Sequence, residues 1–332
     1  MAESFVGNAR NHQLAWALNG GIPVEALEVR RGRVSWVLKR EHRKLNLFRP
    51  YWWDYIAHAE HLWSRALNSS QCLAVNIFGP LADNCVRARR ALQLLLPEHN
   101  LRAEDGVTVR FEYTPQDGPT WMGERKQPTQ IDVYFQVTRS VRCIGHVLVE
   151  VKYSENSFGC CRGWVSKPDE TKRNPDPSRC LDASAIATAP QANCWLAEEE
   201  GRRYWELIAA PGSSIRIEAI RLAGPCPFRH GLYQMMRNRV LADELARHSW
   251  PAWADFAVCR HPANDAVVLL DEPVSEHGNA IRALQSISTD RAIYDWKAQE
   301  LVEVISSTDE KLKDWKAWMV GRYFSHVSGK LP

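Results

Sequence analysis

Two strand-forming runs joined by a short polar connection constrain the fold of this chain more than any other feature. The runs span residues 131–137 (IDVYFQV) and 146–152 (HVLVEVK), and the segment between them contains a glycine. Alternating β-branched and aromatic residues on both sides of such a turn predict a β-hairpin. Folding it about Val141 places Asp132 opposite Glu150, where paired side chains lie about 4.5–5.5 Å apart. The sequence therefore predicts two adjacent carboxylates on one face of a sheet.

A lysine joins these carboxylates. Lys152 follows Glu150 by two residues, so the two-residue period of a strand places both side chains on the same face. Carboxylates held together without a cation repel each other, and a charge inside an apolar strand is costly unless it is paired or bound to a metal. A divalent metal fits this pattern. The alternative is a solvent-exposed Glu–Lys pair with Asp132 as a favourable neighbour.

The acidic-x-Lys pattern is weak by itself, because it recurs along the chain. Two further matches lie in polar loops and three in segments predicted to be helical: Glu124/Lys126, Glu170/Lys172, Asp295/Lys297, Asp309/Lys311 and Asp314/Lys316. The match at Glu150 and Lys152 differs because it lies within an apolar β-run. Strand context therefore carries most of the information.

Periodicity outside the hairpin predicts alternating groups of helices and strands. Helices are predicted at residues 52–67, 70–80 with Ser69 or Ser70 as the cap, 85–96, 194–209, 232–246 and over most of 279–327. Further strands are predicted at residues 107–113, 254–260 and 266–270, and a long polar excursion at 154–191. This order predicts an α/β (α+β) fold with a central mixed β-sheet flanked by helices. We expect a single domain, 1–332, with its core at about 50–262 and a helical C-terminal appendage at about 273–332.

Composition restricts the class of protein. A hydrophobic fraction of 45% and a charged fraction of 24% are typical of a globular chain. The net charge of +3 permits nucleic-acid binding without requiring it. The basic residues at 30–33 and 39–44 form either a solvated face or a rim that contacts phosphates. The N-terminus lacks the pattern of a signal peptide, and no apolar run reaches the length of about 20 residues that a membrane span needs. We expect a cytoplasmic protein with reduced thiols and no membrane contact.

Ordered motifs give the chain a family resemblance. Asp132 with the run Glu150-Val151-Lys152 resembles the active-site pattern of the PD-(D/E)XK nuclease superfamily, although the nearest proline, Pro128, lies four residues before Asp132. Over residues 50–260 the chain also resembles one family of mostly uncharacterised bacterial restriction endonucleases within that superfamily. The motifs that carry this narrower resemblance are Ser69-Ser70-Gln71, Asn76-x-Phe78-Gly79-Pro80, Glu150-Val151-Lys152-Tyr153 and Tyr233-Gln234-x-x-Arg237-Asn238.

The resemblance implies a restriction-endonuclease-like core and divalent-metal-dependent hydrolysis of DNA, in restriction or defence. Asp132, Glu150 and the backbone carbonyl of Val151 would bind Mg²⁺ or Mn²⁺, the ions that suit all-oxygen sites. Lys152 would hold the attacking water or stabilise developing negative charge. DNA is the expected partner, and cutting both strands suggests a homodimer. Two alternatives stay open: a catalytically inactive nuclease-fold protein that binds nucleic acid or a protein partner, and a nuclease acting on RNA or on DNA ends in repair.

Supporting residues are less constrained by the sequence. Glu60 is the candidate third acid, with an exposed position as the alternative, and Gln71 and Asn76 would orient the phosphate or the waters of the metal unless the 69–71 segment only caps its helix. Tyr233 and Gln234 would reach the site, and Arg237 would contact a phosphate.

Cysteines outside the hairpin are a separate question. Some nucleases of the superfamily hold an iron–sulfur cluster with four cysteines, and Cys161, Cys180, Cys194 and Cys226 provide that number. Their spacing matches no known metal-binding motif, so a cluster is not expected.

Overall fold

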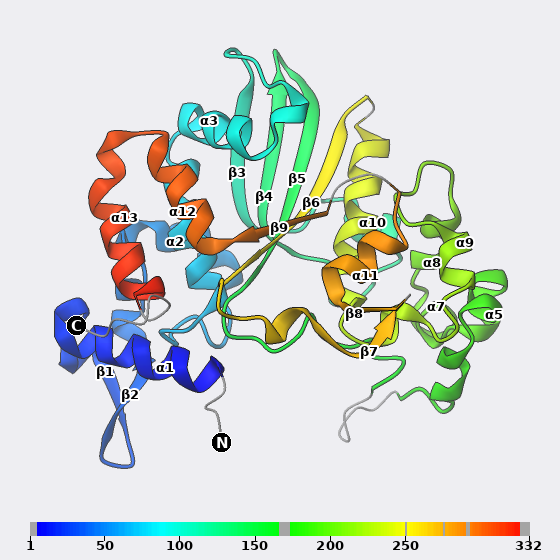
Figure 1. Cartoon of the computed structure of the whole chain (residues 1–332), viewed down its shortest axis with the longest axis horizontal. Coiled ribbons are helices and arrows are strands. Elements are labelled where there is room, and N and C mark those ends of the chain that lie inside the picture. Colours follow the sequence, from blue (N-terminus) through cyan, green and yellow to red (C-terminus); the bar gives the residue numbers. More distant parts are fainter. Residues whose placement is uncertain (1–4, 166–172, 250, 275, 290–292, 326–332) are drawn as a thin grey trace.

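A five-stranded sheet lies at the centre of the molecule, with helices on both faces (Figure 1). The structure is a computed structural model that describes residues 5–165, 173–249, 251–274, 276–289 and 293–325. In spatial order the strands are β3 (Gly106–Tyr113), β4 (Ile131–Arg139), β5 (Arg142–Lys152), β6 (Trp253–Arg260) and β9 (Ile293–Lys297). The strands β3, β4 and β5 pair antiparallel, whereas β6 and β9 continue the sheet in parallel. This mixed sheet between helices confirms the predicted fold class.

The β4–β5 hairpin has the register that the sequence predicts. Val133 pairs with Val149 and Val137 with Gly145, and the register shifts only beyond that point, near the turn. One further step in the same register places Asp132 across from Glu150. The hairpin therefore holds its acidic residues at the end that lies away from its turn.

The two faces of the sheet pack against different helices. Val133 and Val149 belong to a core with α2 (Ser70–Ala82), α3 (Cys85–Leu95) and α12 (Ala298–Ser307). Their neighbours in sequence, Tyr134 and Leu148, point the other way and pack with α10 (Tyr233–His248). Because side chains alternate along a strand, even-numbered residues of the hairpin face α10.

The helices α2 and α3 begin where the sequence predicts. The Ser69 hydroxyl accepts a hydrogen bond from the Cys72 N–H, and the Asn84 side chain accepts one from the Arg87 N–H. Each cap satisfies a backbone donor that the first turn of a helix leaves unpaired. The α2 helix continues past Pro80 to Ala82, slightly beyond the predicted end.

The helix predicted at 52–67 does not form. Short 3₁₀ turns, η4 (Pro50–Tyr55) and η5 (Ala57–Ala59), replace its first half. Its second half runs beside β2 (Arg33–Leu38), which forms a hairpin with β1 (Leu27–Arg30). There the N–H of Leu67 donates to the Trp36 carbonyl. Pairing with β2 provides hydrogen-bond partners for backbone N–H and C=O groups that would otherwise pair within a helix.

Two further predictions need correction. The helix predicted at 194–209 is two helices, α7 (Trp195–Glu200) and α8 (Tyr204–Ala209), separated at Gly201. Gly201 has a φ of +68°, the left-handed conformation that ends helices. The strand predicted at 266–270 is a 3₁₀ turn, η9 (Ala266–Val268), followed by β7 (Leu269–Val274), which pairs with β8 (His277–Asn279) in a separate small sheet.

Short elements complete the described chain. The remaining α-helices are α1 (Phe5–Trp16), α4 (Gly118–Met122), α5 (Ala183–Thr188), α6 (Pro190–Asn193), α9 (Ile217–Arg221), α11 (Ala280–Ser286) and α13 (Lys313–Met319). The predicted excursion at 154–191 carries short helices in its described part, and its residues 166–172 lie outside the described residues. The C-terminal segment shares the main core, because β9 pairs with β6 and α12 packs on α2 and α3. Among the described helices, none combines the length and the apolar character that a membrane span requires.

One buried cation joins the two ends of the chain. The Arg322 side chain is fully buried and lies 4.8 Å from the Trp16 ring and 4.9 Å from the Trp318 ring. Its guanidinium donates to Gln13 Oε1 (3.1 Å) and to the carbonyl of Asn46 (2.9 Å). Arg322 therefore fastens α1 and the end of η3 (Arg40–Asn46) to the C-terminal helices.

Candidate functional site

The predicted acids and lysine meet at the end of the central sheet. Asp132 lies at the start of β4, and Glu150 and Lys152 lie at the end of β5. The N–H of Val151 donates to Asp132 Oδ2 at 2.7 Å, and Lys152 Nζ lies 2.8 Å from Glu150 Oε1. Glu150 and Lys152 are both buried. The exposed Glu–Lys pair that the sequence left as an alternative is therefore not what forms.

A third carboxylate, that of Glu112 on β3, joins this group. Glu112 lies between the register pairs Phe111–Val133 and Tyr113–Ile131, so it is a direct neighbour of Asp132. Its side chain is buried, and its φ of +49° departs from the extended conformation of the strand. Strand alternation groups Glu112 with exposed positions of β3, so the sequence pattern missed it. The local change in backbone conformation turns the Glu112 side chain away from the direction that strand alternation would give it.

Neighbouring side chains fix the position of Glu112. Gln71, in the first turn of α2, donates from Nε2 to Glu112 Oε1 at 2.9 Å. His61 Nε2 lies 3.3 Å from Glu112 Oε2, and the Gln71 side chain also bonds the backbone of Ala59 and His61. The contact with the Glu112 carboxylate raises the pKa of His61 above its ordinary value. Gln71 therefore lies beside the site and positions an acid.

The cluster carries an excess of negative charge. Burial raises the pKa of Asp132 well above its ordinary value, and the carboxylates of Glu150 and Glu112 raise it further. Burial acts against the charged form of Lys152, but Glu150, Glu155 and Asp132 more than offset it and raise its pKa. Lys152 is therefore a firmly protonated cation. Added positive charge would relieve the repulsion among the acids.

Two amides on α10 complete the first layer of contacts. Gln234 Oε1 accepts from Lys152 Nζ at 2.9 Å, and Asn238 Nδ2 donates to Glu150 Oε2 at 2.7 Å. Residues four apart lie on the same side of a helix, which lets both reach β5. The expectation placed Gln234 at the site but omitted Asn238. The four-residue spacing between them was the signal that could have identified it.

Three other expected residues have different partners. Glu60 lies 3.5 Å from Arg43 in an ion pair and accepts a hydrogen bond from Ser64. Asn76 is fully buried and accepts from the Phe48 N–H. Arg237 binds Glu124 Oε1 and Thr129 Oγ1, so it fastens the segment before β4. The structure brings none of the three into contact with the carboxylates.

Tyr233, the first residue of α10, packs against an aromatic residue and an arginine. Its ring packs edge-on against Tyr204, with the centroids 6.2 Å apart, and the Arg237 guanidinium lies 5.5 Å from its centroid. Burial raises the pKa of Tyr233 to about 12. It therefore serves as a neutral packing residue at the start of α10.

Hollows flank the carboxylates on two sides. One, of about 500 Å³, is lined by Glu112 with Tyr55, Arg110 and Gln130. The other, of about 400 Å³, is lined by His61 together with the exposed Trp63 and by residues that follow Lys152. Glu112 and its partner His61 therefore border hollows on the surface, which also contain exposed aromatic and basic side chains.

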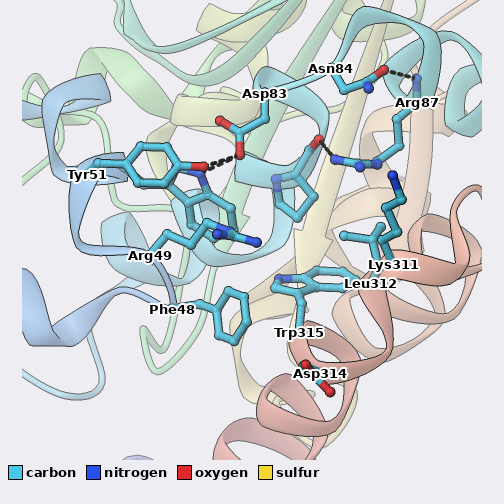
Figure 2. A pocket seen from close by; sticks show the side chains of 12 residues that line it. Phe48, Arg49, Tyr51, Asp83, Asn84, Arg87, Lys311, Leu312, Asp314 and Trp315 are labelled. Atoms are coloured by element: carbon cyan, nitrogen blue, oxygen red, sulfur yellow. Dashed lines mark hydrogen bonds between the residues drawn. The ribbon is translucent and has the colours of Figure 1, made fainter.

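A separate pocket of about 330 Å³ lies at the other end of α2 (Figure 2). Arg49, Arg87 and Lys311 line it, and the Asp83 carboxylate accepts hydrogen bonds from Tyr51 and from two further aromatic residues. Asp83 follows the last residue of α2, whereas Gln71 lies in its first turn. At 1.5 Å per residue they are about 18 Å apart along the helix. This pocket is not part of the acidic site.

A second group of possible metal ligands occupies the opposite face of the sheet. One ligand atom from each of Glu98, His99 and Asp255 lies within 4.8 Å of the other two. His99 Nε2 contacts Asp255 Oδ2 at 2.5 Å and its ring stacks on Trp253. Asp255 pairs with Val147 of β5, whose side chain belongs to the α2 side of the sheet.

The central mixed sheet flanked by helices is the fold class expected of a restriction-endonuclease-like protein. The chain matches the family model described as Restriction Endonuclease associating with ARP (REase-ARP) over residues 38–324. It therefore belongs to this family. No curated protein and no solved structure matches it.

Proposed function

We propose that this chain is a divalent-metal-dependent nuclease of the PD-(D/E)XK superfamily that hydrolyses phosphodiester bonds in DNA. The observation that carries the proposal is the meeting of Asp132, Glu150 and Lys152 at one end of the sheet, with Glu112 beside them. The chain belongs to a family whose description names a restriction endonuclease, which supports a role in restriction or defence.

The donor atoms of the site fit a hard divalent cation. In the described part of the structure, Glu112 Oε2 and Glu150 Oε1 are buried and accept no hydrogen bond, and each has an ion-pair contact instead. Asp132, Glu150 and the Val151 carbonyl would hold Mg²⁺ or Mn²⁺, which prefer oxygen ligands. When bound, such an ion polarises the phosphate and lowers the pKa of water.

The chain's own residues define the rest of the mechanism. A lysine that stays protonated donates hydrogen bonds and does not act as a general base, so Lys152 stabilises negative charge on the phosphate. Gln234 holds the Lys152 ammonium from α10, and Asn238 holds Glu150 from the same helix. Both amides keep the reacting groups in place before substrate binds.

The direct test is cleavage by the purified full chain. We expect supercoiled plasmid to be nicked or linearised in Mg²⁺ or Mn²⁺ and left intact in EDTA, with single-stranded DNA and RNA of one sequence as parallel substrates. Cleavage of RNA with DNA untouched would overturn the assigned substrate. Inertness toward every substrate with both metals would overturn the nuclease proposal and leave the inactive, binding-only alternative.

Metal binding should appear in stability as well as in activity. Folding raises the pKa of Asp132, so the ionised carboxylate destabilises the folded protein. This destabilisation is absent below the pKa of the unfolded chain, about 4, and grows as the pH rises through the pKa of the folded protein. We expect Asp132→Asn to raise the melting temperature of the metal-free protein by roughly 2–4 °C at pH 8, and to lose this gain toward pH 4. Mg²⁺ should raise the melting temperature of the wild type and not that of the variant. Equal Mg²⁺ shifts in both proteins would contradict this site.

The third acid can be tested by a conservative change. Glu112→Gln removes one negative charge and keeps an acceptor for Gln71, so we expect weaker Mg²⁺ binding and cleavage lowered by about 10–100-fold at limiting Mg²⁺, the usual cost of removing a group that supports a metal site. Excess Mg²⁺ should restore part of the rate. Glu60→Gln, whose carboxylate pairs with Arg43, is the matched control and should cleave at the wild-type rate.

A further inference from the structure

Four cysteines far apart in sequence meet between β5 and α10. They lie after β5, in the turn η7 (Pro177–Leu181), before α7 and before the turn η8 (Pro227–Arg229): Cys161, Cys180, Cys194 and Cys226. All four pack in one core cluster, the Cys226 N–H donates to the Cys180 carbonyl at 2.8 Å, and the Cys180 thiol lies 3.9 Å from the Gly163 carbonyl, two residues after Cys161. The four sulfurs are near enough to act on one another electrostatically. All four are free thiols, and three are buried with 7–9% of their surface exposed.

Backbone amides converge on these sulfurs in a repeated pattern. At three of the four cysteines, the backbone N–H of the residue two positions later acts on the sulfur and lowers the pKa of the thiol: Gly163 at Cys161, Leu196 at Cys194 and Phe228 at Cys226. The N–H groups of Trp164 and Ala197, three positions after their cysteines, add to two of them. A thiol is a weak acceptor, whereas hydrogen bonds stabilise the charged form of a sulfur ligand. Three unconnected loops therefore present sulfur in the same way.

The electrostatic setting also favours thiolates bound to a metal. Arg179 lies near Cys180 and Cys194, and Arg229 lies near Cys180. Four thiolates around a metal carry net negative charge, which the two guanidinium groups would offset.

The separation of the sulfurs distinguishes between metals. A single tetrahedral zinc with Zn–S bonds of about 2.3 Å holds its sulfurs about 3.8 Å apart. In the described part of the chain, no three cysteine sulfurs lie within 4.8 Å of one another. The wider arrangement suits a multinuclear centre.

We propose that Cys161, Cys180, Cys194 and Cys226 bind an iron–sulfur cluster. This departs from the expectation drawn from their spacing, because the fold and not a sequence motif brings them together. The helices α5–α9 around the cluster are four to six residues long and too short to be stable alone. The cluster ties them to the loop that enters α10. The inference does not rest on the proposed nuclease activity.

The test is metal analysis of the full chain purified without oxygen. We expect about four iron and four acid-labile sulfide per chain, the content of one [4Fe–4S] cluster, with visible charge-transfer absorption that dithionite bleaches. Cys161→Ser and Cys226→Ser should lose the iron and the absorption. Cys85→Ser, an exposed cysteine, and Cys259→Ala, a buried one in β6, are matched controls that should keep both.

Each other outcome has a defined meaning. About one zinc per chain that disappears in the same variants would overturn the cluster in favour of a mononuclear thiolate site. Absence of metal in wild-type protein, both as purified and after anaerobic reconstitution with iron and sulfide, would overturn the inference, and so would iron retained in Cys161→Ser and Cys226→Ser. The wild-type measurement decides even where a serine variant fails to fold.

Discussion

Lys152→Ala is expected to lower Mg²⁺-dependent DNA cleavage by about 10²–10³-fold, the effect of removing one preorganised group that stabilises charge in the transition state. Lys152 is buried between Glu150 and Gln234, so water replaces its ammonium poorly. Asp132→Ala should lower cleavage at least as much, because it removes a metal ligand. Initial rates on plasmid DNA at saturating Mg²⁺ measure both effects.

The two variants should differ in metal binding. Lys152→Ala should keep the Mg²⁺-induced rise in melting temperature, whereas Asp132→Ala should lose it. Lys297→Ala is the matched control, since Asp295 and Lys297 form the same acidic-x-Lys pattern on β9 and pair with each other at 2.6 Å. Wild-type cleavage by Lys152→Ala would remove this lysine from the mechanism.

Arg322→Met should lower the free energy of unfolding by about 3 kcal/mol or more. At least two buried acceptors, Gln13 Oε1 and the Asn46 carbonyl, would lose their donor, at about 1–3 kcal/mol each. The contacts with the Trp16 and Trp318 rings would be lost as well. Urea unfolding followed by tryptophan fluorescence measures the change.

The control for Arg322 is an arginine with solvent contact. Arg221 pairs with Glu218 on α9 with 39% of its side chain exposed, so Arg221→Met should change the unfolding free energy by less than about 1 kcal/mol. If both variants lose the same small amount, Arg322 does not fasten the termini.

Features set by interactions between residues close in the sequence could be predicted, whereas features set by distant residues could not. The hairpin that carries Asp132 and Glu150 was predictable, because alternation and turn composition are local. The helix predicted at 52–67 was wrong because a distant strand, β2, supplies its backbone partners. Asp295 and Lys297 were assigned to a helix, but they lie on β9, whose parallel pairing with β6 has no local signature.

The candidate site shows the same division. The placement of Lys152 beside Glu150 could be predicted from strand context together with Asp132 across the hairpin. Glu112 could not, since a single residue with positive φ overrides the alternation of β3. Glu60 was expected as the third acid because related nucleases take one from a helix before the sheet, but the helix predicted to carry it does not form, and Glu60 pairs with Arg43. The four cysteines were dismissed because spacing along the chain says little about loops brought together by folding.

The chain leaves the site at Lys152 and returns to it at Gln234, and the described residues between the two include the short helices α5–α9 and the four cysteines. Such an arrangement separates the residues of the site from a segment that is free to vary. The residues that anchor the two ends are constrained by the chemistry, while the roughly eighty residues between them can change in length and surface without altering the sheet, in the way that connecting segments tolerate insertion. We therefore expect relatives of this chain to diverge most in this segment, and differences in target choice among them to map there.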